Sequence, residues 1–272
     1  MSPALLHILS TLAFPLYLAQ GLYVRQKSLR LSPPSEGPLE GQFGDGEPVH
    51  RLLVVGDSSA AGVGLDHTCE TMGFQAAQKL HQRTGETVAW RMSGHNSAVA
   101  GEIRDLVVPN LAPEDYTHIF LMIGTNDMKN WHSAKRWKRE FGGLLYALRT
   151  RFPGAKIYWH QAIDVRDTPM LPKMLGTIMN WRVQIFNRKG AQLCVERGAV
   201  AVPPLDSTNA WGYCRDGFHA NKYGFSYWTD HMLDHIHHTP TSTPAARPHL
   251  PAPDERSFPY AEPPAKLKEE LG

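Results

Sequence analysis

The sequence predicts an α/β domain in which helices cover both faces of a five-stranded parallel sheet. Short apolar runs alternate with longer helical stretches between His50 and His238, which is the order of strands joined by helical crossovers. Polar blocks follow the ends of these runs, and ligands of such sheets bind outside the carboxyl ends of the strands. These two observations indicate a sheet covered on both faces, with a site at one edge.

The expected strands and helices alternate along the chain. Strands are expected at Arg51–Val55, Thr87–Met92, His118–Ile123, Lys156–His160 and Ala199–Val202. Helices are expected between them, at roughly Thr68–Thr84, Ala98–Leu106, Ser133–Arg151, Pro172–Arg197 and Lys222–His237. The crossovers between the parallel strands are expected to be right-handed.

Residues 1–30 differ in kind from this domain. Pro3–Val24 contains no Asp, Glu, Lys or Arg, and its length matches a bilayer span of roughly 20 residues. We therefore expect a hydrophobic N-terminal anchor that associates the protein with a membrane. Arg25, Lys27 and Arg30 follow this segment, and the positive-inside rule then keeps the domain cytoplasmic.

Two alternatives to a straight span stay open for this segment. Pro15 lies in its middle and would kink a helix, so a re-entrant or interfacial anchor also fits. A helix docked on the protein's own surface is the other alternative. The segment has no basic region before it and no A-x-A-like site after it, which argues against a cleaved signal peptide.

Two segments of biased composition flank the domain at residues 50–238. Residues 31–49 are rich in Pro, Gly and acidic side chains and are expected to form a linker. Residues 239–272 hold many prolines and charges without an apolar period, and are expected to form a disordered tail.

Composition excludes several classes of function. The chain of 272 residues is 42% hydrophobic and 20% charged, so it can bury a sizeable core. Its net charge of +2, without a block of Lys and Arg, argues against nucleic-acid binding. Cys69, Cys194 and Cys214 have no C-x-x-C spacing. This argues against a disulfide framework and a zinc site, and it favours buried free thiols in a reducing compartment.

The first expected strand ends in the sequence VVGDSSAAGVG, Val54 to Gly64. A phosphate-binding loop would need a lysine after its glycines or the pattern Gly-x-Gly-x-x-Gly, and neither occurs here. A nucleophile elbow needs Gly-x-Ser-x-Gly, but Ala60 stands at the second glycine. An ordinary strand-to-helix turn with a serine cap stays open on this stretch alone.

Four polar blocks fall on the same edge of the expected sheet. Gly56–Ser58, Ser93–Gly94 and Gly124–Asp127 follow the first three strands. Asp216–His219 follows the fifth strand after a long loop. Because the strands are parallel, their carboxyl ends meet at one edge, and the four blocks are expected to lie together.

Each block carries a residue type that acyl transfer needs. The Ser58 hydroxyl becomes a nucleophile when a base such as His219 removes its proton. Asp216, three residues before His219, can fix the imidazole and stabilise its charged form. The Ser58 N–H, the Gly94 N–H and the Asn126 amide are candidate donors to an oxyanion.

Each of these residues also has a plain alternative. Asp216 and His219 could be a helix cap and a surface histidine, Asn126 a cap of the following helix, and Gly94 a turn glycine. Taken one at a time, the plain alternatives are favoured. Four such residues at one edge favour the catalytic interpretation.

The four blocks resemble those of the SGNH (GDSL-type) hydrolase family, in the same order from Gly56 to His219. The matching blocks are GDS, SG, GTND and DGFH. The resemblance implies a three-layer, flavodoxin-like α/β/α sandwich with strand order 2-1-3-4-5. It also implies hydrolysis of esters or thioesters through an acyl-serine, with no metal or cofactor. The sequence departs from the GDSL form because GDSS is followed by Ala60, so the resemblance does not supply the substrate class.

Two rival functions stay open at this stage. The same site could be an acyltransferase, in which a bound alcohol rather than water accepts the acyl group. The chain could also be a membrane-anchored binding module without turnover, because fold does not determine function.

Other side chains near these blocks have less specific signals. The aromatic residues Trp131, Trp211, Tyr213 and Phe218 either line a substrate pocket or cover the loops against the core. His231, His235 and His238 have metal-ligand spacing on one helical face. No Cys or acidic cluster joins them in sequence, so a solvated helix face is the favoured interpretation and no metal is expected.

Overall fold

The computed structural model describes residues 1–205 and 210–236. The expected tail at residues 239–272 and the position of His238 lie outside the described residues. The three cysteines lie inside them, with Cys69 and Cys194 buried.

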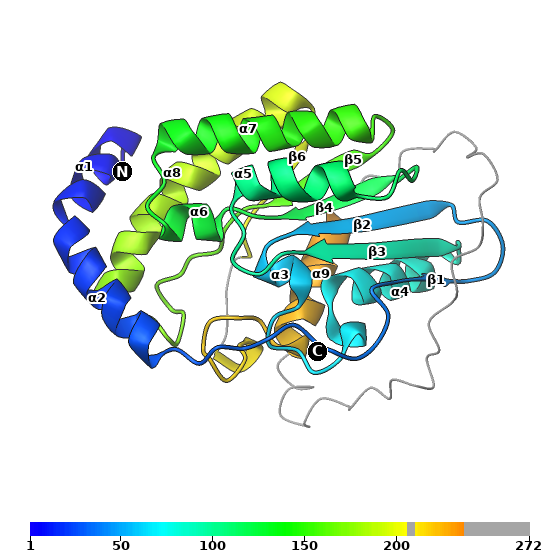
Figure 1. The fold of residues 1–272 in the computed structure, drawn as a ribbon, viewed down its shortest axis with the longest axis horizontal. Coiled ribbons are helices and arrows are strands. Elements are labelled where there is room, and N and C mark those ends of the chain that lie inside the picture. The colour runs from blue at the N-terminus through cyan, green and yellow to red at the C-terminus, as the bar shows by residue number, and fades with distance from the viewer. Residues whose placement is uncertain (206–209, 237–272) are drawn as a thin grey trace.

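Six strands form one sheet in the order β1-β3-β2-β4-β5-β6 (Figure 1). The strands are β1 (Glu40–Phe43), β2 (His50–Gly56), β3 (Val88–Gly94), β4 (His118–Met122), β5 (Lys156–His160) and β6 (Val200–Val202). Strands β2 to β6 are mutually parallel, and their order is the expected 2-1-3-4-5. The prediction of a mostly parallel α/β sheet flanked by helices is confirmed.

The edge strand β1 corrects two expectations, the linker at residues 31–49 and the count of five strands. It pairs antiparallel with β3, and Phe43 packs edge-on against Phe74 with ring centroids 5.1 Å apart. Phe43 is buried, and the other residues of β1 are Glu, Gly and Gln. A single apolar side chain on a short edge strand leaves almost no period to read, which is why the composition resembled a linker.

The described residues contain nine α-helices and several short turns of other helix types. The α-helices are α1 (Pro3–Leu12), α2 (Phe14–Lys27), α3 (Ser58–Ala61), α4 (Met72–Thr84), α5 (Ala100–Glu102), α6 (Thr125–Lys129), α7 (Ala134–Arg151), α8 (Lys173–Arg197) and α9 (Lys222–Asp234). The 3-10 turns are Thr68–Glu70, Val108–Asn110 and Ala210–Gly212, and a π turn spans Ile103–Val107.

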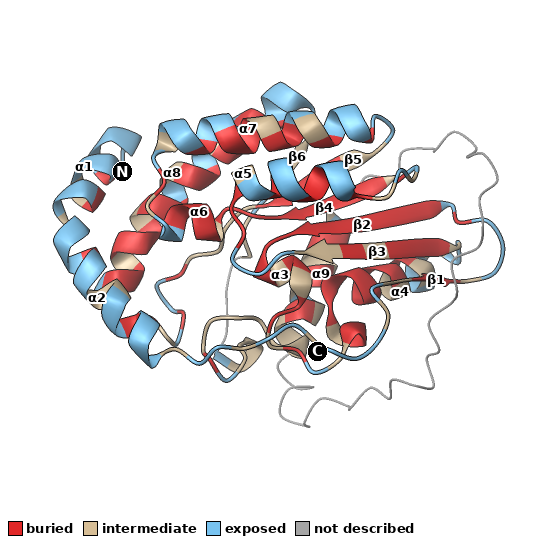
Figure 2. Ribbon diagram, in the orientation of Figure 1, coloured by how far each residue is buried: buried red, intermediate tan, exposed pale blue. Residues whose placement is uncertain are grey.

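Alternate residues of β2 point into two separate cores, which creates the three layers. Leu53 and Val55 pack with α7 and α8 on one face of the sheet. Leu52 and Val54 pack with α4 and α9 on the other face. The central strands β2 and β4 are buried along their whole length, while the outer helix faces stay exposed (Figure 2). This double burial is the reason that the strands read as continuous apolar runs.

Two expected helices differ from the observed ones. The stretch expected at Ala98–Leu106 divides into α5, the π turn and a 3-10 turn that contains Pro109. Proline lacks the N–H that a regular helix requires, so the chain leaves the helix there. The last helix ends at Asp234 rather than His237.

The helices α1 and α2 form a pair bent by 65° that packs along α8 at the left of Figure 1. Pro15 lies in the first turn of α2, so the bend falls where a kink was expected. Tyr17 and Val24 join the core that contains α7 and α8, and the Tyr17 hydroxyl donates a hydrogen bond to the Lys129 carbonyl. The pair therefore docks on the domain, which was one of the open alternatives.

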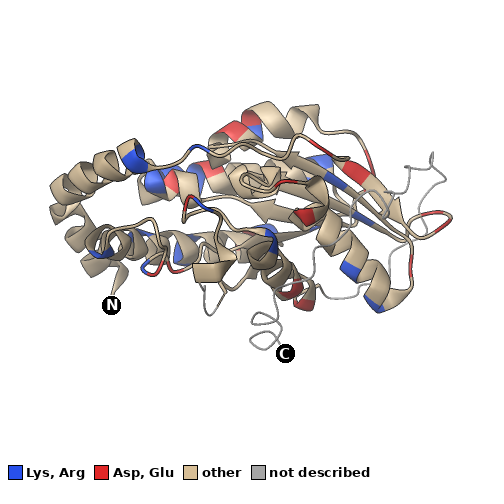
Figure 3. Cartoon of the chain, turned by 90° about the horizontal axis from the view of Figure 1, so that it is seen from below, with Lys and Arg blue, Asp and Glu red and all other residues tan. Residues whose placement is uncertain are grey.

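Most of the large exposed side chains of this pair before the end of α2 are apolar. Among the described residues no single helix has the length and hydrophobicity to cross a bilayer, whereas α1 and α2 reach both when taken together. Apolar N-terminal pairs of this kind occur in signal sequences as well as in anchors. Acidic and basic side chains are spread over the domain, but the N-terminal helices are nearly free of them before the end of α2 (Figure 3). The membrane anchor stays a prediction.

Candidate active site

The loop after β2 lies directly against the neighbouring strand β4. The Asp57 N–H donates to the Met122 carbonyl at 2.9 Å. A Cβ on Gly56 would lie 1.9 Å from the same carbonyl oxygen, so only glycine allows this approach. The chain then turns into α3, whose first residue is Ser58. The first block thus places Ser58 at the carboxyl end of a central strand.

Asp57, rather than a serine, caps α3. Its side chain accepts a hydrogen bond from the Ser59 N–H at 3.0 Å, so the serine cap considered from the sequence is not the one observed. Burial raises the pKa of Asp57 to about 6, against the opposing effects of the Ser59 hydrogen bonds and the charges of Lys129 and His219. Asp57 also lines the same cavity as His219.

Asn126 comes from α6, immediately after β4. It is buried, and its side-chain amide donates to the Ala98 carbonyl at 3.0 Å. This bond fixes the side chain and leaves the second amide N–H as a possible donor. Asn126 is therefore a held side chain and not merely an N-terminal cap of α6.

His219 and Asp216 form a close pair in the loop before α9. His219 Nδ1 lies 2.6 Å from Asp216 Oδ2, and Asp216 Oδ1 accepts the backbone N–H groups of Phe218 and His219. Desolvation acts to raise the pKa of Asp216, but these hydrogen bonds outweigh it and the pKa is lowered. The carboxylate is thus ionised, and it holds Nδ1 so that His219 Nε2 faces elsewhere.

One cavity brings three of the expected catalytic residues together. It has a volume of about 300 Å³, and its lining includes Ser58, Asn126 and His219. Most of the remaining lining is apolar or aromatic, and it includes the expected Trp211, Tyr213 and Phe218. A mainly apolar cavity with a few converging polar groups is the usual form of a small-molecule site.

Gly94 is not among the residues that line this cavity. It stands opposite Gly56 in the register of β2 and β3, and a Cβ there would lie 2.0 Å from the Ala61 nitrogen. The absent side chain therefore admits the backbone of α3.

Trp131 is not among the residues that line the cavity, which favours the alternative that its ring covers a loop. Its indole lies under the Arg182 guanidinium at 4.0 Å and contacts the rings of Phe14 and Tyr17, with centroids 4.8 and 4.5 Å away. Trp131 thus fastens the N-terminal helices to the domain. The sequence predicted that the N-terminal segment is separate from the domain. It therefore indicated no partner for the Trp131 ring.

Sequence reasoning missed the part of the cavity wall built by β5 and α9. His160 ends β5, and Tyr227 and Trp228 belong to α9. Burial, together with the nearby His231 and His235, lowers the pKa of His160 well below the usual value, so this imidazole is neutral. The sequence did offer one indication of this wall. His160 stands at the carboxyl end of a strand, on the same edge of the sheet as the four polar blocks.

The helical histidines His231 and His235 are engaged with the backbone. His231 Nε2 lies 2.8 Å from the Pro203 carbonyl, and His235 Nδ1 lies 2.8 Å from the His231 carbonyl. These hydrogen bonds tie one ring nitrogen of each imidazole to the backbone of the loop and the helix.

A comparison with known protein families identifies the family of this chain. The model of the GDSL-like lipase/acylhydrolase family matches residues 54–241, which is more than half of the chain. This chain belongs to the GDSL-like lipase/acylhydrolase family. The resemblance seen in the four blocks is thereby confirmed, and the protein is a member of a family of lipase and esterase hydrolases.

Solved structures of the same fold come from several bacterial enzymes. They include phospholipase A1 from Streptomyces albidoflavus NA297 (14% identity, TM-score 0.51, covering 69% of this chain and 99% of that one). An extracellular lipase from Streptomyces rimosus gives 14% identity and a TM-score of 0.53, with 69% and 100% coverage. A psychrotrophic esterase from Pseudoalteromonas sp. gives 16% identity and a TM-score of 0.53, with 68% and 95% coverage. At these identities the likeness establishes the fold alone. No curated protein sequence matches the chain.

Proposed function

We propose that this protein is a serine esterase that cleaves carboxylic esters or thioesters through an acyl intermediate on Ser58. The observation that carries the proposal is the Asp216–His219 pair, joined at 2.6 Å, whose histidine lines the same cavity as Ser58. A serine, a histidine that can act as its base and a carboxylate behind that histidine are the complete set for acyl transfer.

In the proposed mechanism His219 Nε2 removes the Ser58 proton as Oγ attacks the ester carbonyl. The imidazolium formed then protonates the leaving alcohol, and a water molecule repeats the sequence to release the acid. Asp216 stabilises the imidazolium by charge and by its hydrogen bond to Nδ1, and its lowered pKa keeps it ionised for this role.

The proposed oxyanion hole consists of the Ser58 N–H, the Gly94 N–H and the Asn126 side chain. Asn126 is held in place by its bond to Ala98, and a donor fixed in advance stabilises the developing charge without reorganisation. Gly94 lies against α3, so its backbone is close to the turn that carries Ser58.

The substrate proposed for this cavity is an ester with an apolar acyl part. Trp211, Tyr213 and Phe218 form its loop wall, in keeping with their expected role in substrate binding. The phospholipase, lipase and esterase neighbours act on different esters, so the chain length that fits is a matter for measurement.

The proposal is tested by turnover of p-nitrophenyl acetate, butyrate and longer esters. We expect a burst of p-nitrophenol followed by steady hydrolysis, because acylation and deacylation are separate steps. Release of product only when an alcohol acceptor is added would assign the site to an acyltransferase. A lack of both burst and turnover across the series would leave a non-catalytic binding module.

We further propose that α1 and α2 associate the protein with a membrane surface, with the domain on the cytoplasmic side. Leu5, Ile8 and Leu12 recur at helical spacing on α1, and Phe14, Leu18 and Leu22 on α2. All six are exposed while the opposite side of the pair docks on α8. Arg25 and Lys27 follow in the last turn of α2, where they can pair with anionic lipid headgroups.

Membrane association is tested with the triple variant Ile8→Ser, Leu12→Ser, Leu22→Ser. These side chains are 54%, 74% and 52% exposed, so their loss should spare the fold. Removing three inserted apolar side chains should weaken flotation with anionic vesicles by about tenfold or more. Hydrolysis of a soluble ester should not change.

The matched control is Leu106→Ser, Val195→Ser, whose side chains are 64% and 81% exposed on the domain. It should float like the wild type. Equal flotation of the triple variant and the wild type, or a wild-type protein that stays in solution, would contradict the proposed surface.

A further inference from the structure

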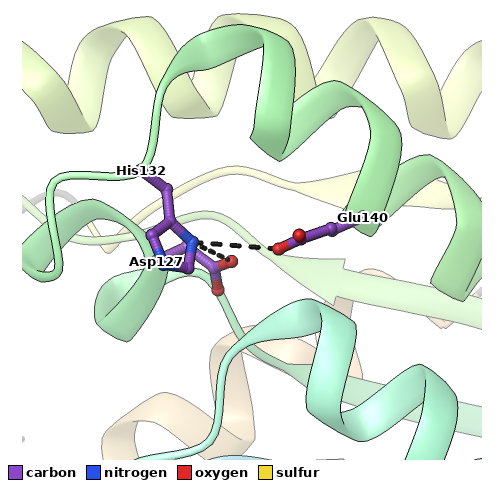
Figure 4. Close-up of side chains that lie close together, drawn as sticks. All are labelled: Asp127, His132 and Glu140. Carbon is purple, nitrogen blue, oxygen red and sulfur yellow. Dashed lines mark hydrogen bonds and ion pairs between the residues drawn. The ribbon is translucent and has the colours of Figure 1, made fainter.

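Three metal-ligating side chains converge behind the active-site loop, in a place that the sequence analysis did not indicate (Figure 4). Asp127 belongs to α6, His132 follows it in the next loop, and Glu140 belongs to α7. His132 Nδ1 lies 3.2 Å from Asp127 Oδ1 and 3.8 Å from Glu140 Oε2. All three residues are buried, and one potential ligand atom of each lies within 4.8 Å of the others.

The remaining oxygen of each carboxylate is already held by another group. The Ala100 N–H donates to Asp127 Oδ2 at 3.0 Å. Arg136 Nε and Arg139 Nη2 donate to Glu140 Oε1 at 2.8 and 3.1 Å. These bonds orient the carboxylates, as outer hydrogen bonds do around metal ligands, and they turn Oδ1 and Oε2 toward the imidazole.

Glu140 Oε2 is left without a hydrogen-bond partner although it is buried. His132 Nδ1 carries at most one proton and can donate it to one acceptor. Asp127 Oδ1 lies nearer to it than Glu140 Oε2 does. A buried carboxylate oxygen without a donor is unusual in a folded protein, and an ion or a water accounts for such groups. Glu140 Oε2 points into the space between the other two residues (Figure 4).

The two carboxylates of the cluster are less accessible to water than the arginines that pair with Glu140. The side chains of Asp127 and Glu140 are only 0% and 8% exposed, whereas those of Arg136 and Arg139 are 45% and 71% exposed. Water screens the two arginines, but it does not screen the two carboxylates from each other. A dication would match the charge of the two carboxylates, and it would lie beside a further buried cation, Arg182, which donates to the His132 carbonyl.

We propose that Asp127 Oδ1, His132 Nδ1 and Glu140 Oε2 bind one divalent transition-metal ion, for which Zn²⁺ is the best match. Two ligands that bind one zinc ion tetrahedrally at 2.0–2.2 Å lie roughly 3.4 Å apart, which is close to the observed 3.2 and 3.8 Å. The imidazole ligand favours zinc over magnesium or calcium. Three protein ligands leave the fourth position to water.

The ion would join α6 to α7 and take no part in ester cleavage. None of its three ligands lines the substrate cavity. Asp127 follows Asn126 directly in α6, so a metal bond to Asp127 would fix the helix that presents the proposed oxyanion donor. The site is thus assigned a structural role that supports the active-site loop.

The test is metal binding by tag-free, full-length protein in mild detergent after treatment with a chelator. We expect one equivalent of Zn²⁺ by titration against a chromophoric chelator, visible d–d absorption from one equivalent of Co²⁺, and a higher melting temperature with zinc. Glu140→Gln keeps an oxygen that can accept from the two arginines but removes the anionic ligand. It should weaken zinc binding by at least about 100-fold. Loss of a residue that only hydrogen-bonds to a metal ligand already lowers metal affinity by up to about 100-fold.

His132→Gln provides a second variant, and the melting temperature without metal establishes that each variant is folded. The control His231→Gln, His235→Gln alters the other histidine group and should bind zinc like the wild type. No stoichiometric binding, or equal binding by the wild type and Glu140→Gln, would overturn the proposal and leave a hydrogen-bonded cluster. Because these readouts need no ester turnover, they stand apart from the test of the proposed function.

Discussion

Replacing Ser58 with alanine should reduce ester hydrolysis by about 10⁴–10⁶-fold, because no other group can then form the acyl intermediate. Ser58 lies at the start of α3 and lines the substrate cavity. The loop should keep its shape, since its conformation depends on Gly56 and on the Asp57 cap. Steady-state kinetics on p-nitrophenyl butyrate measures the loss, and a fluorophosphonate probe should label Ser58 in the wild type.

The matched control is Ser59→Ala. Ser59 lines the same cavity, but its hydrogen bonds go to the Asp57 carboxylate that caps α3. Most of the activity should therefore remain. Labelling of the Ser58→Ala variant at Ser59, with residual turnover, would move the nucleophile to the second serine.

Changes to the Asp216–His219 pair should give the second large effect. His219→Ala should be nearly inactive, because Ser58 loses its base. Asp216→Asn should lower kcat by at least about 10²-fold, and by up to about 10⁴-fold as in the serine proteases. Its neutral amide cannot stabilise the imidazolium and can favour the wrong tautomer. Mass spectrometry after a short exposure to a fluorophosphonate measures how much of the variant is labelled. This measurement separates slow acylation from loss of fold.

The same pair predicts the direction of the pH dependence. A protonated His219 cannot accept the Ser58 proton, so kcat/KM should fall as the pH decreases. The lowered pKa of Asp216 keeps this carboxylate ionised over the acidic limb, which should therefore follow one ionisation. Wild-type activity in His219→Ala, or an unchanged rate and pH profile in Asp216→Asn, would rule out the proposed mechanism.

The four polar blocks and the parallel core were readable from the sequence because their determinants are local. Each parallel strand is buried on both faces, so it appears as a short apolar run. Three polar blocks stand directly after such runs and the fourth follows the last strand after a long loop, and parallel strands bring their ends together at one edge. Ser58, Asn126 and His219 were predicted in this way, and the structure brings them to one cavity.

Only the tertiary structure decided the features that depend on partners far apart in the chain. The strand β1 exists because β3 offers an edge and Phe74 a surface for Phe43. Trp131 turns from the cavity because Arg182 and the docked N-terminal helices surround it. The cavity wall at His160 is completed in the same way by Tyr227 and Trp228 of α9, which are distant from it in the chain.

The roles of the site residues and the membrane association remain predictions. What the sequence determined by itself was the fold class, the family and the positions of the candidate site residues, since these follow from periodicity and from short blocks. The surroundings of each residue were decided by packing. Burial and charge depend on the whole chain, and no local pattern encodes them.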